Sequence, residues 1–101
     1  PELLDKWQRP LGVHVSCWGV RKMKTKCGTC TVDARRIWLN LELAKKSLQC
    51  IEYIVVHELV HLRERHHGEA FTRLMDRHLP DWRQRRAELQ RSTLGAEDWS
   101  A

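Results

Sequence analysis

The sequence predicts an α+β fold in which a small antiparallel sheet packs on a helical layer. Short segments with the pattern of strands occur in the first 40 residues, whereas helical patterns fill most of the remaining chain. The most apolar segment, residues 51–62, contains neither glycine nor proline and predicts a buried helix. With 101 residues, of which 42% are hydrophobic, the chain can form one modest core. We therefore expect a single domain over residues 1–91 and a loose tail over residues 92–101.

The elements of the first 40 residues follow from alternation and from turn-forming residues. Residues 2–8 predict a short helix that is ended by Pro10. Residues 13–20 alternate with period two and predict a strand. Residues 27–32 and 36–39 predict two further short strands, joined by a polar turn at Asp33-Ala34.

The later elements are predicted to be helices. Asn40 is a candidate N-cap for a short helix over residues 41–46, which we expect beside the apolar helix. A further helix is predicted over residues 69–78, after the break at Gly68. Pro80-Asp81 then marks the start of a last helix that ends near residue 90.

The apolar helix carries the segment His57-Glu58-Leu59-Val60-His61. Positions i and i+4 lie on one face of a helix, so the two imidazoles can bind one metal ion. Glu58 lies about 100° around the helix, where its carboxylate can reach a water at that metal. This arrangement is typical of zinc hydrolases. The alternative is that both histidines are hydrogen-bonded core residues, although three buried ionisable groups would then each need partners.

A catalytic zinc usually has three protein ligands, so a third must follow His61. In an unbroken helix, His67 would lie about 9 Å further along the axis and about 240° around it, out of reach. The helix must therefore end near residues 63–65, and the chain must turn back. The spacing His-Glu-x-x-His-x5-His then matches that of metzincins, except that Glu64 replaces their glycine. The candidates are Glu64, His66, His67 and Glu69; we favour His67, with His66 as the alternative.

Five stretches of the chain form a longer pattern in order: residues 21–30, 37–43, 53–62, 67–71 and 79–83. Together they resemble the YgjP-like metallopeptidase family, which is related to the SprT and WLM groups of zincins. The resemblance extends in order from about Leu11 to Leu89, and it implies a zincin-like, zinc-dependent peptidase domain. It also implies that the third ligand is His67, four residues before Phe71. One departure is Cys27, where members of the family usually carry tryptophan.

These observations predict a zinc metallopeptidase that holds one Zn²⁺ per chain through His57, His61 and His67. Glu58 would be the general base, and a peptide or protein would be the substrate. An exposed strand edge at 38–40 or 27–32 could hold an extended peptide by β-addition. The alternative is a non-catalytic zinc-stabilised binding module, but such a module needs no general base and normally has a fourth ligand.

The chain has a formal net charge of +5 and a sequence pI of about 9.4. Its basic residues gather around 21–26 and 83–91, which raises the alternative of a nucleic-acid-associated zinc protease or a DNA-binding partner. Some relatives in the SprT and WLM groups act on proteins attached to DNA. We nevertheless favour solvated charged surfaces as the interpretation of both groups.

The four cysteines are Cys17, Cys27, Cys30 and Cys50, and we favour reduced or structural thiols. A Cys27–Cys30 disulfide and a second metal site are the less favoured interpretations. Reduced thiols predict a cytoplasmic location. No apolar run approaches the ~20 residues of a membrane span. The start at Pro1, without an initiator methionine, suggests a C-terminal piece of a longer protein.

Overall fold

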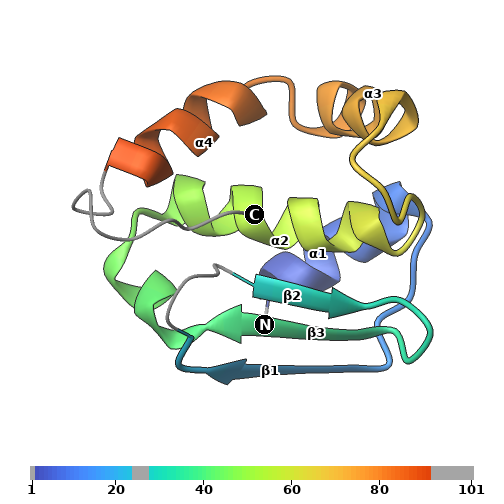
Figure 1. Cartoon of the computed structure of the whole chain (residues 1–101), viewed down its shortest axis with the longest axis horizontal. Helices are drawn as coiled ribbons and strands as arrows, with labels where there is room; N and C mark the ends of the chain where they lie inside the picture. The colour runs from blue at the N-terminus through green and yellow to red at the C-terminus, as the bar shows by residue number, and fades with distance from the viewer. Residues whose placement is uncertain (1, 24–27, 92–101) are drawn as a thin grey trace.

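The computed structural model describes residues 2–23 and 28–91. The predicted strand start at Cys27 and the predicted tail over 92–101 lie outside the described residues. The predicted α+β class is confirmed (Figure 1). The histidine motif lies on a buried helix of the helical layer, as predicted. The elements in chain order are α1 (Glu2–Leu11), β1 (Cys17–Arg21), β2 (Gly28–Thr31), β3 (Arg36–Asn40), the 3-10 helix η1 (Leu41–Lys45), α2 (Leu48–His61), α3 (Glu69–His78) and α4 (Trp82–Arg91).

The sheet is mixed, so the prediction of an antiparallel sheet is wrong for one of its two strand pairs. β3 lies in the middle, antiparallel to β2 and parallel to β1. After β1 the chain continues to β2, which is not adjacent to β1 in the sheet. The turn after β2 then places β3 between β1 and β2. Asn40, at the end of β3, accepts a hydrogen bond from the Met23 N–H (3.3 Å) and donates one to the Met23 carbonyl (3.0 Å). This buried amide therefore fixes the start of the connection between β1 and β2.

Two boundaries near the N-terminus differ from the prediction. α1 continues through Pro10 to Leu11 and closes with Gly12 in the left-handed region, at φ 67°. The Gly12 and Val13 N–H groups donate to the last turn of α1, which is the usual pattern of a glycine-terminated helix. β1 begins only at Cys17, because the Val15 N–H donates to the Gln8 side chain instead of joining the sheet.

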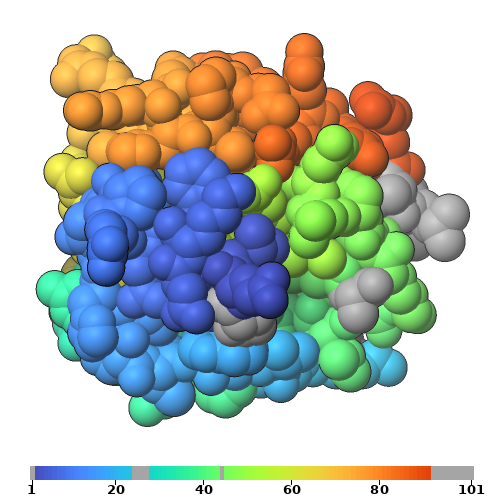
Figure 2. Space-filling model, turned by 180° about the vertical axis from the view of Figure 1, so that it is seen from behind, coloured from blue at the N-terminus to red at the C-terminus, as the bar shows by residue number. Residues whose placement is uncertain are grey.

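Helix α2 forms the centre of the core. Every residue from Tyr53 to Val60 is buried, because this helix contacts β2 and each of the three other α-helices. Figure 1 shows α2 running between the sheet and the pair α3 and α4. Figure 2 shows the molecule from behind, and α1 lies on that face. The predicted N-cap is confirmed, since Asn40 Oδ1 accepts from the Glu42 N–H at 3.0 Å. The short helix predicted over residues 41–46 is the 3-10 helix η1. The predicted helices near 69–78 and 82–90 are confirmed as α3 and α4.

Polar contacts tie the outer helices to this centre. Glu52 on α2 accepts from Lys6 Nζ (2.9 Å), Trp7 Nε1 (2.8 Å) and Arg85 Nη1 (2.9 Å). Burial raises the pKa of the Glu52 carboxyl, but these three donors outweigh burial and lower it to about 2. One ionised side chain thus joins α1, α2 and α4. None of the described helices is long and apolar enough to span a membrane.

Candidate metal centre

Three histidines from α2 and the segment after it converge on one point. One nitrogen from each of His57, His61 and His67 lies within 4.8 Å of the others, and the Nε2 atoms of His61 and His67 are 2.8 Å apart. His57 is buried, His61 is half-buried and His67 is exposed. Three neutral imidazole nitrogens are a common donor set for a catalytic zinc, so these residues fit a metal of that kind.

The orientation of the His61 ring is set by the turn that follows α2. Its Nδ1 lies 3.1 Å from the carbonyl oxygen of Arg65. Because a carbonyl oxygen only accepts, Nδ1 must carry the proton, which leaves the lone pair of Nε2 directed toward His67. Burial, followed by the neighbouring His67, lowers the pKa of His61 and favours the neutral ring that a metal requires.

Glu58 lies between α2 and strand β2. Its side chain is buried, with the residue only 3% exposed. A Cβ atom built at Gly28 would lie 3.4 Å from the Glu58 Cγ and 3.5 Å from its Oε2. Cys30 is also close, since burial and then the charge of Glu58 raise the pKa of its thiol to about 11. The Glu58 carboxylate is therefore held against the inner face of β2.

Phe71 on α3 packs on all three imidazoles. Its ring centroid lies 5.0 Å from that of His57, 4.8 Å from His61 and 4.7 Å from His67. Phe71 is itself buried. The apolar ring limits access of water to the histidines from the side of α3, and it restricts the orientations that the rings can adopt.

The turn between α2 and α3 brings His67 back to the motif. α2 ends at His61, and the Arg63 and Glu64 N–H groups still donate to the Val60 carbonyl, which tightens the chain there. The predicted helix end near residues 63–65 is thus accurate to within about one helical turn.

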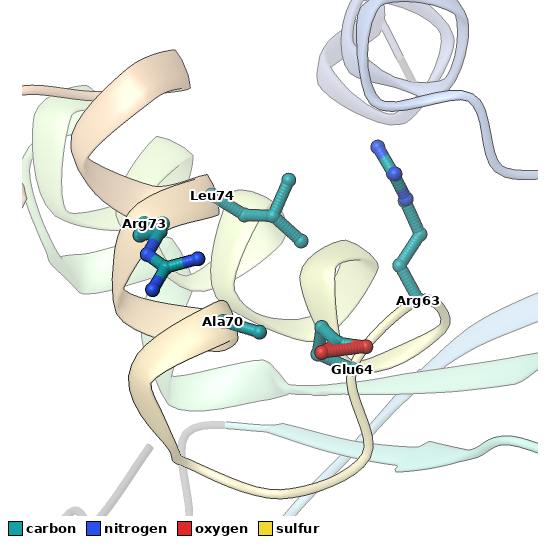
Figure 3. A pocket seen from close by; sticks show the side chains of 5 residues that line it. All are labelled: Arg63, Glu64, Ala70, Arg73 and Leu74. Carbon is teal, nitrogen blue, oxygen red and sulfur yellow. The ribbon is translucent and has the colours of Figure 1, made fainter.

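A hollow of about 330 Å³ lies between the α2–α3 connection and α3 (Figure 3). Its lining residues are Arg63, Glu64, Ala70, Arg73 and Leu74.

The other predicted candidates for the third ligand do not join the histidine group. Among the described residues, the group that could hold a metal contains His67 but not His66, Glu64 or Glu69. Glu64 lines the hollow beside α3 (Figure 3). Glu69 pairs with Arg73 on the surface of that helix. The geometry therefore favours His67 over the alternative, His66.

A second hollow, also of about 330 Å³, lies at the end of β2. It is lined by Cys30, Thr31, Val32, Asp33 and Arg65, and Asp33 and Arg65 form an ion pair of 2.9 Å across it. The prediction that residues 38–40 could offer a free strand edge is wrong, because β3 is paired on both sides. Within the described residues, β2 pairs with β3 alone, so its other edge remains open beside Glu58.

Sequence analysis did not identify Gly28, Asp33 or Arg65 as parts of this region. For Gly28 a signal was present, because a glycine inside a strand pattern often marks a close approach of the backbone to another group. Asp33 and Arg65 are 32 residues apart, and no local pattern indicates that they meet.

The cysteines and the basic groups can be compared with their predictions only in part. The thiols of Cys17, Cys30 and Cys50 are free, whereas Cys27 lies outside the described residues. Arg83 pairs with Asp76 and Arg85 pairs with Glu52 and Asp81, so two arginines of the C-terminal basic group are engaged within the chain. No observation on the described residues supports binding of nucleic acid.

Comparisons with solved structures agree with this architecture. The metallopeptidase zymogen abylysin of Pyrococcus abyssi is 22% identical to this chain and covers 98% of it and 97% of its own length, with a TM-score of 0.79. The metallopeptidase zymogen jannalysin of Methanocaldococcus jannaschii is 16% identical, with coverages of 92% and 95% and a TM-score of 0.79. At these identities the likeness shows the fold. No curated protein matched the chain.

A protein family described as YgjP-like, metallopeptidase domain, matches residues 1–92. The match covers nearly the whole sequence and includes the three histidines that the structure brings together. The resemblance predicted from the sequence is therefore confirmed, and the chain belongs to the family of YgjP-like metallopeptidase domains.

Proposed function

We propose that this protein is a zinc-dependent peptidase that binds one Zn²⁺ through His57, His61 and His67. The observation that carries the proposal is the convergence of the three imidazole nitrogens, with the buried Glu58 carboxylate on the same helix. Three protein ligands leave one position of a tetrahedral zinc available to water or substrate, which distinguishes catalytic from structural sites.

The zinc ion and Glu58 would have different roles in the proposed reaction. A zinc ion held there would polarise the substrate carbonyl and acidify water beside it. The Glu58 carboxylate accepts a proton from the attacking water and later delivers it to the leaving amine. Its burial against β2 excludes bulk water, which strengthens its interaction with charge that develops in the transition state.

The open edge of β2 is the proposed binding surface for an extended peptide. Its backbone N–H and C=O groups could pair with those of the substrate, as in β-strand addition. Because Gly28 and Cys30 of this strand lie near Glu58, a peptide paired with β2 would pass close to the proposed base. The preference of the enzyme for particular peptide sequences would then depend on the side chains of the protein that line the hollow at the end of β2.

The first experiment measures zinc content and zinc affinity for the wild type, His67→Ala and the matched control His66→Ala. One zinc per chain is expected in the wild type and in the control, with a loss of affinity of about 100-fold or more in His67→Ala. Equal affinity in the wild type and His67→Ala would refute the proposed ligand set.

The second experiment tests catalysis with Glu58→Gln on a library of quenched fluorescent peptides. This variant should keep its zinc and lose hydrolysis, because the amide cannot accept the proton. Since abylysin and jannalysin were each solved as a zymogen, the wild type is also assayed after limited proteolysis. Full activity in Glu58→Gln would refute the mechanism, and a fourth protein ligand in the zinc-loaded protein would favour the non-catalytic binding module.

A further inference from the structure

The turn between α2 and α3 is held from two sides by arginines at alternate positions. Arg63 Nη1 donates to the Leu11 carbonyl at the end of α1, at 3.2 Å. Arg65 Nη2 donates to Asp33 Oδ1 in the β2–β3 turn, at 2.9 Å. The segment that carries His67 is therefore anchored to two different parts of the fold before it reaches the histidine group.

Arg65 makes one contact through its side chain and another through its backbone carbonyl. Its side chain binds Asp33, and its backbone carbonyl accepts from His61 Nδ1 at 3.1 Å. The position of the side chain limits where the carbonyl can lie, and this carbonyl, together with the backbone of Glu64, favours the proton on the ring nitrogen of His61 that faces the turn. A surface ion pair is thereby connected to a ring that faces the proposed metal.

The anchor at Asp33 is itself well defined. The β2–β3 turn is closed by a hydrogen bond from the Arg35 N–H to the Val32 carbonyl, at 3.1 Å. Arg35 adopts φ 50° in this turn, and its carbonyl accepts from the Ser16 N–H at 2.9 Å. The turn is thus closed by its own backbone and connected to the segment that precedes β1.

We propose that the Asp33–Arg65 ion pair positions the imidazole of His61 for metal binding. The inference rests on the proposed function, because it assigns His61 to the metal. Arg65 is a positioning residue: its carbonyl holds the proton-bearing Nδ1, so Nε2 remains directed at Nε2 of His67, 2.8 Å away. Fixing the tautomer and the ring in the metal-free protein reduces the ordering that must accompany binding.

The size of the effect follows from exposure. The side chains of Arg65 and Asp33 are 57% and 91% exposed, and pairs of this kind contribute little in isolation. We therefore expect zinc affinity to fall about three- to fivefold when the pair is broken, far less than on loss of a ligand. Salt should reduce the difference between wild type and variant, because it screens exposed charges.

The test is a double-mutant cycle on zinc affinity, with Asp33→Ala, Arg65→Ala and the combined variant. Both single variants should weaken binding, and the double variant should be no weaker than either, because each removes the same contact. The exchanged pair Asp33→Arg with Arg65→Asp should recover part of the affinity. Additive effects of the two single substitutions, or affinities equal to that of the wild type, would overturn the inference.

A matched control is the pair formed by Arg73 and Glu69 on α3. Their side chains are 72% and 80% exposed, and they begin two residues after His67. Glu69→Ala should leave zinc affinity within about twofold of the wild type. A loss equal to that in Asp33→Ala would show that any nearby charge has the same effect, and the inference would fail.

A second readout does not require zinc. Long-range ¹H–¹⁵N correlation spectra of the metal-free protein report which nitrogen of His61 is protonated. The wild type should show the Nδ1-protonated tautomer, and Arg65→Ala should show a mixture of tautomers or exchange broadening. An unchanged tautomer in Arg65→Ala would contradict the inference. Because this measurement needs no zinc, failure of the inference can be distinguished from failure of the proposed function.

Discussion

Gly28 lies directly against Glu58, and no larger residue fits between β2 and the proposed base without displacement. A Cβ atom at position 28 would lie 3.4 Å from the Glu58 Cγ and 3.0 Å from the backbone carbonyl oxygen of Trp38. The contact with Trp38 is the more severe, because a backbone atom in the central strand cannot rotate away.

Gly28→Ala should therefore displace β2 relative to α2. We expect kcat to fall about ten- to a hundredfold, with a stability loss of about 1–2 kcal/mol and little change in zinc affinity. Steady-state kinetics, urea unfolding and zinc titration measure the three effects. The control is Thr29→Ala, which alters the opposite face of the strand; the idea fails if both variants are equally active.

Phe71 should prove important for metal binding although it offers no ligand atom. Phe71→Leu keeps most of the buried volume but removes the flat surface against the three imidazoles. We expect a stability loss of about 1 kcal/mol and a clear drop in zinc affinity, whereas Phe71→Ala should cost about 3–4 kcal/mol. Zinc binding at the wild-type level in a folded Phe71→Leu variant would contradict this role.

Asn40 should contribute more to stability than an ordinary helix cap. It caps η1 and also fixes the backbone of Met23. Asn40→Ala should destabilise the protein by about 2 kcal/mol, because it leaves several backbone groups without their partner. Ser47→Ala, which removes the cap of α2 and a long, exposed 3.5 Å hydrogen bond to Glu88, is the comparison and should cost about 1 kcal/mol. Equal losses in urea unfolding would contradict the second role of Asn40.

Stability should decrease with acid because of Glu52. Its pKa is lowered to about 2 in the folded protein from an ordinary value of 4.5, so the unfolded chain binds the proton first as pH falls. The stabilisation is complete above about pH 4.5 and is lost toward pH 2, with a magnitude of about 2 kcal/mol. In thermal unfolding, Glu52→Gln should flatten this dependence, while Glu2→Gln at the exposed start of α1 should preserve most of it.

Cys30 should react slowly with alkylating reagents at neutral pH. Burial and then the charge of Glu58 raise the pKa of its thiol to about 11, whereas Cys17 is exposed. Peptide mapping should show faster labelling of Cys17 than of Cys30. In Glu58→Gln the labelling of Cys30 should accelerate while that of Cys17 stays constant; identical rates for Cys30 in both proteins would argue against the contact.

The parts of the structure that sequence analysis predicted depend on local patterns. The helix around His57 follows from a mostly apolar segment without glycine or proline, and the need for a third ligand predicted that the chain turns back after His61. The hairpin of β2 and β3 is likewise local, because a short polar turn joins strands of suitable length.

The parts that were not predicted depend on contacts distant in sequence. The parallel pairing of β1 with β3 requires the chain to cross one strand position, and alternation along β1 is the same in either direction. The continuation of α1 past Pro10 depends on the hydrogen bonds that Gly12 and Val13 make to the end of the helix. The contact of Asp33 with Arg65 exists only once the sheet and α2 are assembled.

One edge of β2 has no partner strand in residues 2–23 and 28–91, and this has a consequence for the behaviour of the protein at high concentration. Its four residues, Gly-Thr-Cys-Thr, include no charge and no proline, which are the usual means by which an edge strand resists pairing with another chain. A strand that binds a peptide, as we propose for β2, cannot easily be protected in this way. Self-association through β2 would therefore compete with substrate, and added peptide ligands should keep concentrated solutions of the protein from aggregating.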